Sequence, residues 1–132
     1  MFNVFDAFAA QEKEIQKLPE GSYDATVVAA AAYEDDPEKR PVIRLRLSVD
    51  VGESARYITH WLRVGETPRA LAFFFGQLAI LGIDKRWIKN HSDAGLTAVA
   101  QAIASECPDV ILTSENYEWN GEIRTQYRLN KR

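Results

Sequence analysis

The sequence predicts a mainly β protein with inserted helices, a five-stranded Greek-key barrel of the OB type. Three runs with strand character open the chain, a proline-started apolar helix and a second helical stretch follow, and a hairpin ends it. Strands interrupted by helix after the third strand are the element order of an OB barrel. We therefore expect one domain, with a short N-terminal helix or arm at residues 1–18 and the barrel at residues 19–132.

The composition supports a single packed core, because 46% of the 132 residues are hydrophobic. The one cysteine, Cys107, excludes an intramolecular disulfide framework and a cysteine-cluster metal site, and we expect it to be a small buried side chain in a reducing compartment. The N-terminal residues lack a basic leader, and no apolar run approaches the roughly 20 residues of a membrane span. We therefore expect no membrane partner.

The N-terminal segment has a broken helical spacing of apolar residues, namely Phe2, Phe5, Phe8, Ile15 and Leu18. In one interpretation these residues cover a sheet face or one end of the barrel. In the other, the segment docks onto a partner.

The first strand is expected at residues 22–33, after the turn signal Pro19-Glu20-Gly21. The alanines at residues 29–32 would also suit a helix, but the β-branched residues at positions 26–28 favour a strand. Small side chains suit the bend at which a first barrel strand serves both halves of the sheet.

The second strand, residues 42–51, alternates between apolar and polar side chains, which predicts one buried and one wet face. The buried set is Ile43, Leu45, Leu47, Val49 and Val51, and the wet set is Arg44, Arg46, Ser48 and Asp50. In the third strand, residues 56–64, we expect Ile58 and Leu62 to point inward. Tyr57, Trp61 and Arg63 then point outward, whereas a slip of one residue would put Arg56 and His60 there.

Thr67 and Pro68 are typical of a helix start, as N-cap and first helical residue. A core-facing stripe follows until Gly82 ends the helix, formed by Leu71, Phe74, Phe75, Leu78 and Leu81. A basic one-turn connector at residues 84–89 and a short helix ending before Cys107 lead to the last strands, residues 110–117 and 122–129. Asn120 and Gly121 between these strands predict a type I′ hairpin.

The net charge of −3 weighs against a sequence-independent nucleic-acid binder, but the charge is unevenly distributed. Residues 1–36 carry eight acids and two lysines, a net charge of −6, whereas residues 37–132 carry eleven acids and fourteen bases, a net charge of +3. Most of the predicted barrel is therefore mildly basic.

The sequence shows no pattern of catalytic or metal-binding residues. His60 and His91 lie far apart without companions at metal-ligand spacing, and the glycines form no phosphate-binding loop. The acidic run Glu34-Asp35-Asp36 is expected to be a solvated turn rather than a Mg²⁺ site. We therefore expect no enzymatic activity, no metal and no cofactor.

The first candidate site is formed by aromatic and basic side chains on the predicted outward faces. Single-stranded nucleic acid is bound by cations that follow its phosphates and by flat rings on which its bases stack. Arg44 and Arg46 share one face of the second strand, and pairing would join them to the outward residues of the third strand, Tyr57, Trp61 and Arg63. Alternatively, the rings pack under the helix and the arginines only solubilise the sheet.

The final hairpin is the second candidate site, with Tyr117, Trp119, Arg124 and Arg128 as its binding residues. In an OB barrel this hairpin and the loop after the first strand flank the binding groove. The opposite wall is then formed by Tyr33, Lys39 and Arg40. The alternative is a cross-strand pair of Tyr117 or Trp119 with Ile123.

The chain resembles the phage-encoded single-stranded DNA-binding proteins of OB fold, a family long known only as a domain of unknown function. The likeness covers nearly the whole chain and lies in Asn3-Val4-Phe5-Asp6, Leu18-Pro19-Glu20-Gly21-Ser22-Tyr23, Ile43-Arg44-Leu45-Arg46-Leu47, Arg69-Ala70-Leu71 through Leu81-Gly82, and Tyr117-Glu118-Trp119-Asn120-Gly121-Glu122.

The resemblance implies non-enzymatic, largely sequence-independent binding of single-stranded DNA in phage DNA replication or recombination, in the host cytoplasm. It also implies replication or recombination proteins as partners and leaves homo-oligomerisation open. Many such proteins end in an acidic tail that recruits partners, whereas this sequence ends in Lys131 and Arg132, which are expected to touch DNA instead.

Two other function classes stay open. In the first, the same barrel is a protein-interaction or assembly module, which the net negative charge and the segment with Phe2, Phe5 and Phe8 favour. In the second, an enzyme such as a nuclease uses Glu34, Asp35 and Asp36 with Mg²⁺.

Overall fold

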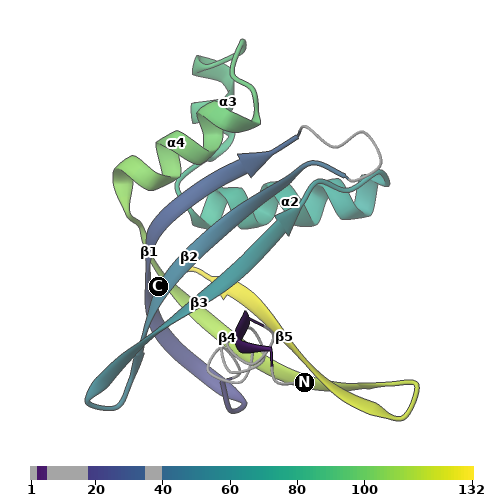
Figure 1. The fold of residues 1–132 in the computed structure, drawn as a ribbon. Helices are drawn as coiled ribbons and strands as arrows, with labels where there is room; N and C mark the ends of the chain where they lie inside the picture. The colour runs from purple at the N-terminus through teal and green to yellow at the C-terminus, as the bar shows by residue number, and fades with distance from the viewer. Residues whose placement is uncertain (1–2, 6–17, 35–39) are drawn as a thin grey trace.

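The structure, a computed structural model, describes residues 3–5, 18–34 and 40–132 (Figure 1). Its strands are β1 (Gly21–Tyr33), β2 (Val42–Val51), β3 (Ser54–Arg63), β4 (Asp109–Trp119) and β5 (Glu122–Asn130). Between β3 and β4 the chain forms α2 (Pro68–Ile80), α3 (Lys85–Asn90) and α4 (Leu96–Glu106). The fold is therefore mainly β with helices after the third strand, as the sequence predicts.

The strands form one antiparallel sheet in the order β3-β2-β1-β4-β5. β1 pairs with β4 through residues 21–26 and with β2 through residues 25–33. Val28 is an extra residue between the pairs that Val27 and Ala29 form with β2, which makes a β-bulge. A bulge bends a strand, and this one comes just after the last residue paired with β4. β1 thus serves both halves of the sheet, as predicted.

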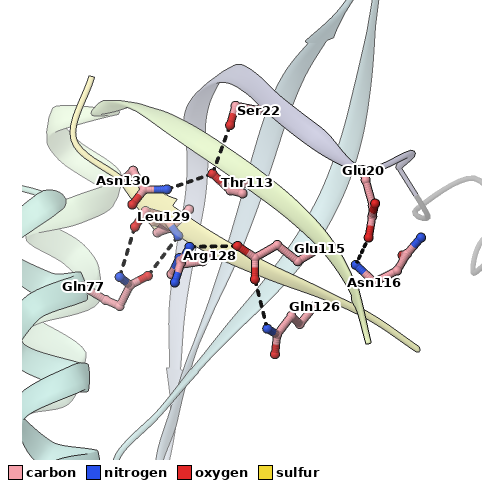
Figure 2. Close-up of polar contacts among 10 residues, drawn as sticks. All are labelled: Glu20, Ser22, Gln77, Thr113, Glu115, Asn116, Gln126, Arg128, Leu129 and Asn130. Carbon is pink, nitrogen blue, oxygen red and sulfur yellow. Dashed lines mark hydrogen bonds and ion pairs between the residues drawn. The ribbon is translucent and has the colours of Figure 1, made fainter. Parts of the chain in front are cut away.

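The predicted barrel is not closed, because no strand pairing joins β3 and β5 within the described residues. Helix α2 contacts both of these edge strands instead (Figure 1). The buried Gln77 side chain takes the place of a strand partner for β5: its Nε2 donates to the Leu129 carbonyl and its Oε1 accepts from the Leu129 N–H, each at 3.1 Å (Figure 2). A helix therefore satisfies backbone groups that a closing strand would otherwise satisfy.

The hydrophobic core lies between the inner face of the sheet and helices α2 and α4. The predicted register of β2 and β3 is confirmed, since the buried residues include Ile43, Leu45, Leu47, Val49, Ile58 and Leu62, with Val51 half-buried at the strand end. On the predicted helical stripe, Phe74, Leu78 and Leu81 are buried and Leu71 is half-buried. Phe75 is exposed, contrary to the prediction, because it follows Phe74 by about 100° around the helix axis and so points away from the sheet.

The predicted helix start and hairpin are confirmed. Thr67 caps α2, with its Oγ1 accepting from the Ala70 N–H at 3.1 Å. Asn120 and Gly121 form a two-residue turn with φ of 52° and 79°, as a type I′ hairpin requires. The prediction for Cys107 is wrong: the residue is exposed, because it ends α4 in a left-handed conformation where the chain leaves the helix.

Among the N-terminal phenylalanines, Phe5 lies within the described residues, whereas Phe2 and Phe8 do not. Phe5 is exposed, so it does not cover the sheet as the first interpretation expects. Leu18 is buried; its N–H donates to the Tyr127 hydroxyl at 3.2 Å, and its carbonyl accepts from Ser114 Oγ at 3.0 Å. Leu18, the last residue of the predicted arm, is therefore part of the hydrophobic core.

Candidate nucleic-acid interface

The outer surfaces of β1, β2 and β3 bring together most of the first candidate site. In β3, Trp61 lies opposite Arg44 of β2, and Tyr57 lies opposite Ser48, two residues from Arg46. Side chains at every second position of a strand share a face, so these residues and Tyr33 of β1 form one surface. We call Tyr33, Arg44, Arg46, Tyr57 and Trp61 the β1–β3 face.

The bulge in β1 puts Tyr33 on this surface. Before the bulge, Ala25 and Val27 are buried, and simple alternation from them would turn Tyr33 inward as well. After the bulge, Ala30 and Ala32 face the core, while Tyr33 is exposed. Tyr33 was expected in the groove wall opposite the hairpin; it is the last residue of β1 and lies beside Trp61 and Arg44 instead.

Cations and rings alternate across the β1–β3 face. The guanidinium carbon of Arg44 lies 5.3 Å from the centre of the Tyr33 ring, and that of Arg46 lies 5.2 Å from the centre of the Tyr57 ring. The Tyr33 and Trp61 rings are 6.4 Å apart at an angle of 50°. Such cation–π contacts contribute about 0.5–1 kcal/mol each at exposed sites, so they orient the arginines without burying their charge.

The face is open to solvent. Tyr33, Tyr57 and Trp61 are 44%, 52% and 46% exposed, so the alternative in which Tyr57 and Trp61 pack under the helix is wrong. No ion pair within the described part of the chain involves Arg44 or Arg46. Their charge therefore stays available to an anionic ligand.

A shallow depression of about 240 Å³ lies between the two arginines. The β1 segment at residues 29–31 lines it between the arginines, and so does Thr59 of β3. The small residues were predicted to serve a bend in β1, and Thr59 was not among the predicted site residues. The signal was present in the pattern, because Thr59 lies between Tyr57 and Trp61 on the same outward-facing set.

A second opening lies beside the β1–β3 face and shares Trp61 with it. It has a volume of about 340 Å³ between β3, α2 and β5, and is lined by Arg40, His60, Trp61, Arg63, Phe73 and Tyr127 among others. Arg40 pairs with Glu66 at 3.5 Å. Burial lowers the pKa of His60 to about 4, so this imidazole is neutral at pH 7.

The predicted hairpin residues form a separate surface, which we call the hairpin tip: Tyr117, Trp119 and Arg124. All three are exposed, and Arg124 pairs with Glu122 at 3.7 Å. The alternative pairing with Ile123 is wrong, since Ile123 lies opposite Glu118 and therefore on the other face of the hairpin. Figure 1 shows the tip at the lower right, apart from the upper ends of β1–β3 where the loop after β1 begins. Lys39, predicted beside that loop, lies outside the described residues.

Two further arginines, one in β5 and one just after it, form ion pairs with acids. Arg128 pairs with Glu115 at 2.8 Å (Figure 2), and Arg132 pairs with Asp24 and Asp109 at 3.5 and 3.4 Å. Exposed ion pairs are weak, but they reduce the net positive charge here. The positive charge of Arg128 and Arg132 is therefore partly offset by these acids.

The described residues contain no group of three or more histidines, cysteines, aspartates or glutamates that would hold a metal ion. In the same part of the chain, no helix has the length and apolar character needed to cross a membrane. Of the acidic run considered for Mg²⁺, Glu34 is described and Asp35 and Asp36 are not.

A scan against protein-family models matches no family, and a search among curated proteins finds no similar one. The resemblance to phage single-stranded DNA-binding proteins therefore stays a prediction.

Proposed function

We propose that this protein binds single-stranded DNA without catalysis and with little sequence preference, through the β1–β3 face. The observation that carries the proposal is the alternation of Arg44 and Arg46, which form no ion pair with the described residues, with exposed Tyr33, Tyr57 and Trp61 on one continuous surface. Arginines contact phosphates, and each base stacked on an aromatic ring contributes about 1–3 kcal/mol.

Weak sequence preference follows from the kind of contacts available. Stacking accepts any base, because every base has a flat π-face, and guanidinium groups bind phosphates that all nucleotides share. Along β3, Tyr57 and Trp61 are four residues apart, or about 13 Å at roughly 3.3 Å per residue. The two rings therefore serve different bases of one strand, with the depression between Arg44 and Arg46 receiving the backbone between them.

We further propose that the fold is an open variant of the OB barrel. The strand order β3-β2-β1-β4-β5, with β1 shared between both halves, supports this assignment. Closure between β3 and β5 would complete the barrel, and α2 with its Gln77 occupies that position here. In OB folds the strand face in question is a common binding surface for oligonucleotides.

Phage DNA replication or recombination in the host cytoplasm is the proposed setting, and it rests on the resemblance alone. Proteins of those pathways would then be the partners.

The proposal is tested by adding the protein to labelled oligo-dT, and to a labelled duplex of equal length, at low and at moderate salt. Binding is followed by the fluorescence anisotropy of the labelled DNA. Binding of the single strand should weaken with salt because phosphate binding releases counterions. Replacing Trp61 by alanine should weaken binding by roughly fivefold to 150-fold, the equivalent of one lost stacking contact.

The matched control is Trp119→Ala at the hairpin tip. Equal losses for Trp61→Ala and Trp119→Ala would extend the interface to the hairpin tip. The absence of single-strand binding by the unmodified chain would refute the proposal and favour the assembly module.

A further inference from the structure

A groove on the far side of α2 from the sheet is not used by the proposed DNA site. It lies between α2 and α3 and has a volume of about 560 Å³. Phe75 and Ile88 line it with large, exposed side chains. The small residues Gly76 and Ala79 and the buried Ile83 form the rest of its apolar lining. Lys85 and Lys89 lie at its border.

The groove belongs to a helix that is apolar on both sides. Arg69 is the one charged residue of α2, and Phe73 and Phe75 stay exposed although the opposite side of the helix is buried. A helix that is apolar all round is typical of a buried element. A Cβ at Gly76 would meet no atom within 4 Å, so packing within the chain does not require glycine there. The open space suits an external side chain.

The N-terminal residues offer a complementary feature. Val4 and Phe5 have helical backbone and are 72% and 77% exposed, among the most exposed large apolar side chains described. Asp6 follows them directly, and residues 6–17 carry three acids, Asp6, Glu12 and Glu14, against Lys13 and Lys17, a net charge of −1.

The charges of groove and segment also match. No ion pair among the described residues involves Lys85 or Lys89. The nearby carboxylate of Asp84 caps α3 by accepting from the Trp87 N–H at 2.9 Å, so it is directed into the helix start. An apolar groove bordered by lysines fits an acidic segment with large apolar side chains.

We propose that the N-terminal segment around Val4 and Phe5 of one molecule docks in the α2–α3 groove of a second copy of this chain. These residues do not contact the groove of their own molecule where they lie, because the dark purple N-terminal fragment is in the lower part of Figure 1 and α3 is at the upper end. The contact joins two different surfaces, so it is heterologous and adds molecules head to tail. This assembly does not depend on DNA binding.

The test is sedimentation velocity of the full chain without DNA, across a roughly hundredfold range of concentrations. The sedimentation coefficient of the unmodified protein should rise with concentration. Phe5→Glu, which damages the segment, and Ala79→Glu, which damages the groove, should each lower the association constant roughly tenfold or more. Ile123→Glu, an equally exposed apolar position on the hairpin, should leave association unchanged.

A mixture of the two damaged proteins decides the arrangement. Phe5→Glu keeps an intact groove and Ala79→Glu keeps an intact segment, so an equal mixture should form dimers that grow no further. A mixture that stays monomeric would overturn the proposal, as would an unmodified chain that is monomeric throughout. Association that survives Phe5→Glu would overturn it as well, because the segment would then not carry the contact. Lys89→Glu replaces Ala79→Glu if circular dichroism shows the latter to be unfolded.

Discussion

Replacing Gln77 by glutamate tests whether the hydrogen bonds between α2 and the edge strand β5 stabilise the fold. Gln77 is buried and makes two hydrogen bonds of 3.1 Å to the backbone of Leu129, one as donor and one as acceptor. Glutamate has nearly the same shape, but as a carboxylate it has no donor. The Leu129 carbonyl would then face a negative oxygen in a buried site, whereas the protonated carboxyl would restore both bonds.

The expected effect of Gln77→Glu is a decrease in the free energy of unfolding. A buried backbone carbonyl left without its donor costs about 1–3 kcal/mol, and a buried charge adds to this. The loss of stability has an upper limit, because the carboxyl can take up a proton instead of staying charged. The ordinary pKa of glutamate, about 4.3, lies about 2.7 pH units below pH 7, and protonation costs about 1.36 kcal/mol for each unit. Gln77→Glu should therefore lose roughly 2–4 kcal/mol at pH 7.

The pH dependence has a defined sign. Burial raises the pKa of the introduced carboxyl above its unfolded value, so the folded state binds the proton more tightly. The folded state of the variant is then relatively most stable below about pH 4.3 and loses stability as pH rises through the folded pKa. The deficit against the unmodified protein should shrink to under about 1 kcal/mol in acid.

Urea unfolding followed by tryptophan fluorescence, at several pH values from about 4 to about 7.5, measures this deficit. Gln101→Glu on the exposed side of α4 is the matched control, since it introduces the same charge without burial. Gln77→Leu separates hydrogen bonding from ionisation, because its deficit should not vary with pH. The reasoning fails if Gln77→Glu loses no more than Gln101→Glu at pH 7, or if its deficit is the same in acid.

Three further predictions concern ionisation, backbone conformation and phosphate contacts. Burial lowers the pKa of His60 to about 4, so below about pH 6.5 the unfolded chain binds a proton that the folded chain does not. The free energy of unfolding should therefore fall by roughly 2 kcal/mol between pH 7 and pH 5. In urea unfolding, His60→Gln should abolish this loss. Gly121→Ala should destabilise by about 1–2 kcal/mol because φ is +79°, whereas Gly76→Ala, in open space within α2, should stabilise by up to about 1 kcal/mol in the same assay. Arg44→Ala should reduce the slope of log affinity for oligo-dT against log salt by about 0.7, while Arg69→Ala should leave it unchanged; equal slopes for both would contradict the phosphate role.

The sequence predicted those parts of the fold that local chemistry determines. Alternation in β2 and β3 identified which side chains are buried, and Thr67 and Gly121 marked a helix start and a turn, because each signal depends on residues close in the chain. How the sheet edges are covered depends on contacts far apart in the chain, such as that between Gln77 and Leu129, which are 52 residues apart, and no local pattern reports it. The sequence therefore predicted a barrel, whereas the sheet is not closed within the described residues.

The bulge in β1 shows how one irregular residue links the fold to the proposed site. Val28 adds a residue where β1 leaves β4, so the strand bends there and the faces of all later residues exchange. Two consequences follow together: Ala30 and Ala32 turn to the core, and Tyr33 joins Trp61 and Arg44 outside. A regular strand would bury the Tyr33 ring and leave the first strand of the β1–β3 face without an aromatic side chain. The bend that lets β1 serve both halves of the sheet is thus the same feature that completes the proposed binding surface.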